Sequence, residues 1–433
     1  MTAIPLDRSN SLEGRDRLLR SALFLVTFLQ VCVTAAPFPD LSDPALLDPT
    51  GDGNLTGQVL TVLLTGTLGL FVLVKRLRLV LKAVTPILVL TFAWFAVSAI
   101  FSAHPDLAAR RLVLAAFTIF QATVLLLLPQ DREHFARLLA AGALIVLALC
   151  YGGVLLAPEH SIHQASDIAE PILAGDWRGF FVHKNGAGAA MVLLIFFGIF
   201  IVRSSSPILG ALVIALAAVF LAFTRSKSSM ILFPLALTIS FVLPRLRNPV
   251  VRYAAAASIP AIIAVLTIAS VEIDSAHFLA QLLPDPTFTG RDEIWQFTLD
   301  KISERPVVGF GYQAFWRTSE LLSSWNYLES WGYRASDAHN GFLNLAVMTG
   351  LVGLAFALIW VFVQPLRDLN RTPAGRIDPA LTTLFLQIWL FVLYLCGFES
   401  ELFSGGSFTW FMTLAAIIGL RFQAKVEYAP GST

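Results

Sequence analysis

Long apolar runs separated by short polar segments make up most of this chain. A hydrocarbon core about 30 Å thick requires about 20 apolar residues in helical form, because backbone polar groups exposed there find no partners. The sequence therefore predicts an all-α integral membrane protein of about twelve transmembrane helices, arranged as one polytopic domain over residues 1–433. The twelve runs lie near residues 18–37, 57–75, 84–101, 112–129, 137–157, 187–202, 207–223, 229–243, 250–272, 340–364, 379–397 and 408–421.

One polar segment is much longer than the others. Residues 273–339, between the ninth and tenth runs, form the segment that has room for a subdomain. Within it, Thr289 is the predicted cap of a helix over residues 292–305, and Pro306 ends that helix. The apolar residues of this helix recur at i, i+4 and i+7 and share one face: Trp295, Leu299 and Ile302. We expect a short amphipathic helix on the membrane surface.

The basic residues predict the orientation. With twelve crossings both termini share a side, and that side carries 19 of the 30 Lys and Arg residues. The positive-inside rule then makes both termini cytoplasmic in a bacterial inner membrane, with the long loop and residues 158–186, 224–228 and 398–407 in the periplasm. The first run is too long for a signal-peptide core and is predicted to be a signal anchor.

Composition supports this class and excludes others. Apolar residues make up 56% of the chain, charged residues only 14%, and the mean hydropathy is +0.73. The net charge of +1 gives no global field that would recruit nucleic acid. Cys32, Cys150 and Cys396 all lie in apolar runs without CxxC spacing, which indicates core packing.

The turn Thr224–Ser229, with sequence TRSKSS, is the first place that could carry chemistry. Arg225, Lys227 and four hydroxyls at one membrane edge suit a lipid-linked phosphate, since arginine holds phosphate oxygens in bidentate fashion. The alternative is that both cations snorkel to anchor the helix ends.

Two further candidates flank the long loop. Arg291 lies at the first turn of the predicted 292–305 helix, where the helix dipole favours an anion; alternatively it pairs with a neighbouring carboxylate. His339, in Asp337-Ala338-His339-Asn340, has an imidazole suited to take a proton from a substrate hydroxyl near neutral pH, with Asp337 or Asn340 to orient it. The alternative is a histidine that only caps the next helix.

A fourth cluster precedes the sixth run. Arg178, His183, Lys184 and Asn185 add cations and a second imidazole at the same membrane edge. Aromatic rings of the periplasmic segments either stack on sugar faces or form an interfacial belt. The tryptophans concerned are Trp177, Trp295, Trp316, Trp325 and Trp331.

Missing motifs narrow the chemistry. The sequence has no P-loop, no GxGxxG and no HExxH, and Glu399 and Glu401 are too isolated to argue for a metal. We therefore predict neither a metal nor a cofactor. Arginines on the outer face, together with one well-placed base, suit a reaction driven by a phosphate leaving group on that face.

Four stretches together resemble the O-antigen ligase and polymerase superfamily. The resemblance covers residues 170–364 in detail, and the HKN and GRDEIW segments look most similar to exopolysaccharide polymerases of the succinoglycan type. The four stretches are FVHKNGAGAA, TRSKSS, FTGRDEIWQFTLDKISERPVVGFGYQAFW and DAHNGFLNLAVMTGLVGLAF.

The resemblance implies a metal-independent, inverting glycosyltransferase with a GT-C-like helical membrane fold. Its donor would be an undecaprenyl-diphosphate-linked glycan, and its acceptor another lipid-linked repeat or, in a ligase, lipid A core. Arg225 and Arg291 match the family's diphosphate-binding arginines, and His339 matches its expected general base. Chain-length regulators or export proteins are partners expected by resemblance.

A function from a different class also fits twelve helices. A flippase or transporter of lipid-linked oligosaccharides would have a polar central cavity and would need no catalytic histidine. The enzyme hypothesis instead predicts essential residues on the outer face.

Overall fold

The computed structural model describes most of the chain. The described residues are 7–33, 37–43, 55–272, 275–276, 280–281, 287–316, 318, 336–372 and 378–425.

Helices account for nearly all of the regular structure, and the predicted all-α class is confirmed. Within the described ranges, one isolated bridge between Ile162 and Trp177 is the only β pairing. The α-helices are α1 (Asp7–Cys32), α2 (Leu55–Lys75), α3 (Leu77–Ala83), α4 (Pro86–Ile100), α5 (Pro105–Leu125), α6 (Arg132–Leu156), α7 (Lys184–Ser204), α8 (Pro207–Thr224), α9 (Lys227–Val242), α10 (Pro249–Val271), α12 (Arg291–Glu304), α14 (Gly341–Leu358), α15 (Gln364–Arg371), α16 (Pro379–Leu395) and α17 (Phe408–Lys425).

The number of membrane crossings is lower by a strict length and hydropathy criterion than the twelve predicted. In the described part of the chain, eight helices are long and apolar enough to span a membrane. A ninth span is possible if α3 and α4, which meet at a bend of 73°, count as one. Each of the twelve apolar runs overlaps a helix among the described residues, but only eight or nine of these helices meet the criterion. The count of twelve crossings therefore stays a prediction.

Local sequence sets where several helices begin. α4, α8 and α16 each have proline at the first helical position, where its missing N–H costs no hydrogen bond. The residue before each proline supplies a side-chain oxygen that accepts from the first-turn amides: Thr85, Ser206 and Asp378.

Burial separates central helices from peripheral ones. α7, α16 and α17 are buried over almost their whole length, and their side chains form much of the core. α2 and α10 instead expose leucine, valine and isoleucine side chains, for example Leu63, Leu70 and Val265. Exposed apolar side chains on spanning helices suit contact with lipid. All three cysteines are free and buried, as predicted.

The predicted helix over residues 340–364 is interrupted at Gly350. This glycine has φ +71°, and a β-carbon there would lie 1.9 Å from the carbonyl oxygen of Val307. The segment after α12 fills the break: Leu351 N–H donates to Pro306 (2.8 Å) and Gly311 N–H donates to the Met348 carbonyl (2.8 Å). These bonds fix the end of α12 against α14.

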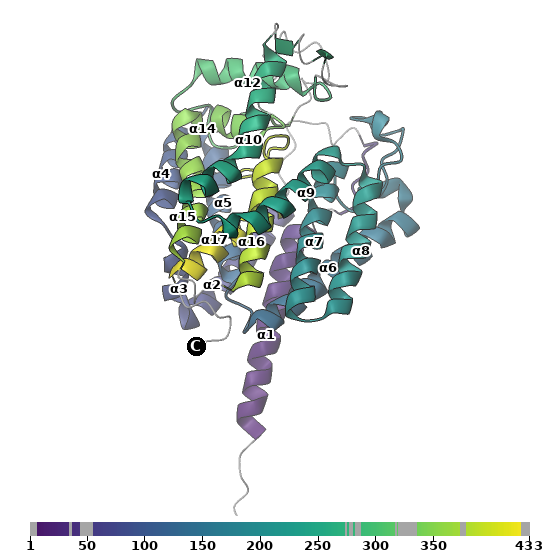
Figure 1. The fold of residues 1–433 in the computed structure, drawn as a ribbon, viewed down its shortest axis with the longest axis vertical. Helices are drawn as coiled ribbons and strands as arrows, with labels where there is room; N and C mark the ends of the chain where they lie inside the picture. Colours follow the sequence, from purple (N-terminus) through teal and green to yellow (C-terminus); the bar gives the residue numbers. More distant parts are fainter. Residues whose placement is uncertain are drawn as a thin grey trace, which may run out of the picture.

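The two ends of the bundle differ. α12 lies at one end, and the first turns of α1 lie at the opposite end (Figure 1). α12 is the described helix of the predicted 273–339 loop; residues 282–286 and 319–335 of that loop lie outside the described residues.

Candidate active site

Arg291 begins α12 and is held by a carboxylate from a distant segment. Its Nη2 lies 2.8 Å from Oε1 of Glu399, in the segment between α16 and α17, and both side chains are about 15% exposed. The predicted position of Arg291 in the first helical turn is confirmed. The predicted cap is wrong, because Gly290, with φ +76°, occupies the cap position instead of Thr289.

His339 faces the same carboxylate. Its Nδ1 lies 3.6 Å from Oε2 of Glu399 and 3.9 Å from Oδ1 of Asp337. The Asp337 carboxylate also accepts the backbone N–H of His339 (2.8 Å), which fixes the turn. The His339 backbone has φ +45°, a conformation that non-glycine residues rarely adopt and that is found at functional sites.

These charges shift the proton affinities of the site. Burial acts to raise the pKa of Glu399, but Arg291 and His339 outweigh it and hold that pKa at about 2. Burial acts to lower the pKa of His339, but Asp337 and Glu399 outweigh it, so the pKa lies above its ordinary value. The carboxylate is therefore ionised, and the imidazole is a stronger base than usual.

The start of α7 contacts this group through Asn185. Its Nδ2 donates to Oε1 of Glu399 (2.9 Å). His183 caps the same helix, because its Nδ1 accepts from the Asn185 N–H (3.1 Å) while its Nε2 donates to Glu170 (2.7 Å). Burial acts to raise the pKa of Glu170, but the His183 hydrogen bond lowers it below its ordinary value. These bonds fix His183 as the Nε2–H tautomer.

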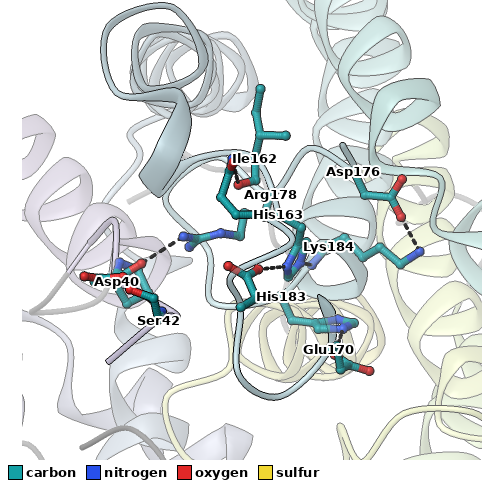
Figure 2. Close-up of polar contacts among 12 residues, drawn as sticks. Asp40, Ser42, Ile162, His163, Glu170, Asp176, Arg178, His183 and Lys184 are labelled. Atoms are coloured by element: carbon teal, nitrogen blue, oxygen red, sulfur yellow. Dashed lines mark hydrogen bonds and ion pairs between the residues drawn. The ribbon is translucent and has the colours of Figure 1, made fainter. Parts of the chain in front are cut away.

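A second carboxylate joins Lys184 and Arg225. Asp176 accepts from Lys184 Nζ (2.6 Å) and from Arg225 Nη1 (3.2 Å), and Figure 2 shows Lys184 reaching Asp176. Arg225 follows α8 with φ +50° and remains 70% exposed. Asp176 therefore joins Arg225 to Lys184. Asn185, the next residue after Lys184, contacts Glu399, which also contacts Arg291 and faces His339.

Three of the four hydroxyls of the TRSKSS turn, predicted to suit a lipid-linked phosphate, are buried. Thr224, Ser226 and Ser229 are buried, and Ser226 Oγ donates to Ser229 Oγ (3.1 Å). Gly188 of α7 lies against this pair, since a β-carbon there would be 2.6 Å from Ser226. Close packing against α7 thus accounts for the small hydroxyl side chains of this turn. Lys227, by contrast, is exposed at the start of α9.

Arg178 lies apart from the other accessory candidates. It is fully buried and donates to the carbonyls of Phe181 (3.0 Å) and Pro39 (2.8 Å). Figure 2 shows its guanidinium pointing toward the segment of Asp40, away from Lys184. Arg178 therefore stabilises the segment before α7 and joins it to the segment around Pro39.

Asn340 and the described tryptophans also have structural roles. Asn340 caps α14, accepting from the Phe342 and Leu343 amides, so it does not orient His339 directly. Trp295 and Trp316 are buried, and Trp177 stacks on Phe223 with ring centroids 4.3 Å apart. Packing therefore accounts for these three rings better than sugar stacking does. Trp325 and Trp331 lie outside the described residues.

Glu399, Asp176 and Glu170 are the site residues that sequence reasoning missed. Each lies in a short polar segment between apolar runs, where a carboxylate is unusual and usually has a partner. That placement was the available signal, but the partners are far away in sequence. In the described residues, no group of three or more His, Cys, Asp or Glu side chains is arranged to hold a metal.

Comparisons with known proteins agree with the resemblance. Residues 210–358, which include Arg225, Arg291 and His339, match the family model described as O-Antigen ligase. The exopolysaccharide production protein ExoQ of Rhizobium meliloti (strain 1021) is 32% identical over 103 residues, which are 23% of this chain and 24% of that protein. The match thus spans about a quarter of this relative. Residues 210–358 are therefore similar to the O-antigen ligase family, and part of the chain is similar to an exopolysaccharide production protein.

Proposed function

We propose that this membrane protein polymerises undecaprenyl-diphosphate-linked oligosaccharide repeats into exopolysaccharide at the periplasmic face of the inner membrane. The observation that carries the proposal is that Arg291 and His339 meet at Glu399. Arg225 is connected to this group through Asp176, Lys184 and the adjacent Asn185. Two cations and one basic imidazole are what transfer from a diphosphate donor requires.

The chemistry is a direct displacement. His339 takes the proton of an acceptor hydroxyl, whose oxygen attacks the anomeric carbon of the donor. The bond from that carbon to the diphosphate oxygen breaks, and Arg225 and Arg291 stabilise the charge on undecaprenyl diphosphate. A single displacement inverts the anomeric configuration, and neither a metal nor a cofactor takes part.

The arrangement of the helices supports the orientation. α12, which carries Arg291, lies at the end of the bundle opposite the first turns of α1 (Figure 1). A cytoplasmic N-terminus would place the site in the periplasm, where lipid-linked repeats are presented and chain-length regulators or export proteins could bind.

Ligation is the second candidate, and the family description favours it. An O-antigen ligase would use the same donor chemistry but transfer the glycan to lipid A core. The similarity to an exopolysaccharide production protein favours polymerisation.

Complementation of a deletion strain separates the candidates. Cells carrying wild-type or His339→Ala protein at matched expression are compared for long polymer, lipopolysaccharide and lipid-linked intermediates. Polymerisation predicts that His339→Ala abolishes long polymer and that single repeats accumulate on undecaprenyl diphosphate. Loss of the lipopolysaccharide outer chain with polymer retained would indicate a ligase. Wild-type behaviour of His339→Ala in both assays would reject an enzyme using this histidine and favour a flippase.

A further inference from the structure

Glu399 lies where three separate parts of the chain meet. We propose that Glu399 is a positioning residue for the transfer reaction: one carboxylate oxygen holds Arg291 and Asn185, and the other faces Nδ1 of His339. This inference rests on the proposed function. The partners come from the start of α12, the start of α7 and the segment before α14, so one carboxylate sets the relative positions of the cation and the base.

Burial makes these contacts specific. The Glu399 side chain is 16% exposed and accepts from Arg291 at 2.8 Å and from Asn185 at 2.9 Å. A buried carboxylate without partners is costly, so movement of Arg291 or Asn185 away from Glu399 is opposed. The guanidinium of Arg291 and the imidazole of His339 are thereby held on the two oxygens of one carboxylate, that of Glu399.

The backbone around Glu399 is itself bonded to the His339 segment. Asn340 Nδ2 donates to the Gly397 carbonyl (3.3 Å), and Gly341 N–H donates to the Cys396 carbonyl (2.7 Å). Gly341 also packs closely, because a β-carbon there would lie 3.3 Å from the Glu399 carbonyl oxygen. These bonds between residues 340–341 and residues 396–397 fix the distance between Glu399 and His339.

This arrangement suits a base that reacts through Nε2. Nδ1 of His339 is buried, whereas the side chain as a whole is 27% exposed, so the exposed part lies elsewhere on the residue. In a neutral imidazole, a proton on Nδ1 directed at Glu399 puts the basic lone pair on Nε2. The Nδ1–Oε2 distance of 3.6 Å is longer than a hydrogen bond but within ion-pair range.

Four charged side chains around the imidazole of His339 determine how loss of Glu399 would change its proton affinity. Asp337 faces it from its own segment, Glu399 from the α16–α17 segment, Arg291 from α12 and Glu170 from the loop before α7. Removing the Glu399 charge leaves Arg291 as an uncompensated cation near the ring, so His339 should bind its proton less tightly. A purely structural ion pair would predict a folding defect without this change.

The test uses full-length protein purified into lipid, with Glu399→Gln compared with Glu401→Gln. Glu401 is a matched control because it is a half-buried carboxylate two residues away, bonded to Ser407 and Thr409. We expect Glu399→Gln to reduce turnover about 10- to 100-fold and to move the acidic limb of the pH–rate profile to lower pH. Glu399→Asp should restore part of the rate, and Glu401→Gln should keep the wild-type limb.

A second measurement does not depend on glycosyl transfer. Diethyl pyrocarbonate modifies neutral imidazoles, and mass spectrometry of the His339 peptide gives the pH of half-maximal modification. The inference predicts a lower midpoint in Glu399→Gln than in wild type and Glu401→Gln. If wild type neither polymerises nor ligates but the midpoint shifts, the proposed function fails and the contact stands. An unchanged midpoint in a folded Glu399→Gln protein would overturn the inference.

Discussion

At the residue scale, the site consists of pairs in which each proposed functional side chain contacts a carboxylate. Arg225 contacts Asp176, Arg291 contacts Glu399, and His339 lies between Asp337 and Glu399. These carboxylates balance the charges of the cations. A diphosphate entering the site would compete with them for the arginines.

The two arginines should differ when each is replaced. We expect Arg225→Ala and Arg291→Ala each to lower turnover by roughly 10²- to 10³-fold, because each removes a donor to the leaving group. Arg225 is largely exposed, so its variant should keep the wild-type melting temperature. Arg291→Ala should also melt lower, since it leaves the buried Glu399 charge without its main partner.

Turnover by purified protein and melting by fluorescence-detected size exclusion measure these effects. Arg247→Ala, an exposed cation beyond α9, is the matched control and should behave as wild type. Wild-type turnover in both Arg225→Ala and Arg291→Ala would refute the diphosphate-binding assignment.

The pH dependence follows from the His339 environment. Because Asp337 and Glu399 raise the pKa of His339 above its ordinary value, the neutral base is lost on acidification at a higher pH than for a free histidine. Turnover should therefore fall below that pKa and be constant just above it. An acidic limb that is unchanged in an Asp337→Asn protein would contradict this assignment.

At the element scale, the helices position these residues through a few backbone contacts. The break in α14 at Gly350 receives the segment that follows α12, which fixes the helix carrying Arg291 against the one that follows His339. The close approach of α7 at Gly188 similarly places the Asn185 end beside the TRSKSS turn.

Gly350→Ala tests the break in α14. The backbone at Gly350 (φ +71°, ψ 173°) disfavours alanine by roughly 1–3 kcal/mol, and the added β-carbon would collide with Val307. We expect a lower melting temperature and weaker activity. Gly69→Ala is the control, because a β-carbon at Gly69 meets nothing within 4 Å. Equal stability of the two variants would show that the break does not depend on glycine.

Hydropathy predicted the helices because burial in lipid requires long apolar runs, and each run overlaps a helix among the described residues. It did not predict the interruption at Gly350, since an isolated glycine in an apolar run carries no local signal and the break depends on contacts with residues 306–311. Motifs identified Arg225, Arg291 and His339 as candidates. They did not identify Glu399, whose contacts come from segments distant in sequence.

At the scale of the whole molecule, the proposed function requires the site and the α9–α10 connection to lie on opposite sides of the membrane. The native cysteines are buried, so single introduced cysteines can report the side. Lys227 and Arg247 are both exposed, at the start of α9 and beyond its end.

Labelling with a membrane-impermeant maleimide gives the expected pattern. Lys227→Cys should react in cells with a permeabilised outer membrane, and Arg247→Cys should react only after lysis, because α9 separates them. The reverse pattern would place the site in the cytoplasm and contradict the proposed donor.

The most direct test of the central claim is reconstitution of the purified protein with one defined undecaprenyl-diphosphate-linked repeat. Polymer length and released undecaprenyl diphosphate are measured together, with and without EDTA, for wild type and His339→Ala. We expect wild type to release one undecaprenyl diphosphate per linkage formed, EDTA to have no effect, and His339→Ala to give neither product. Polymer formation by His339→Ala at the wild-type rate would contradict it.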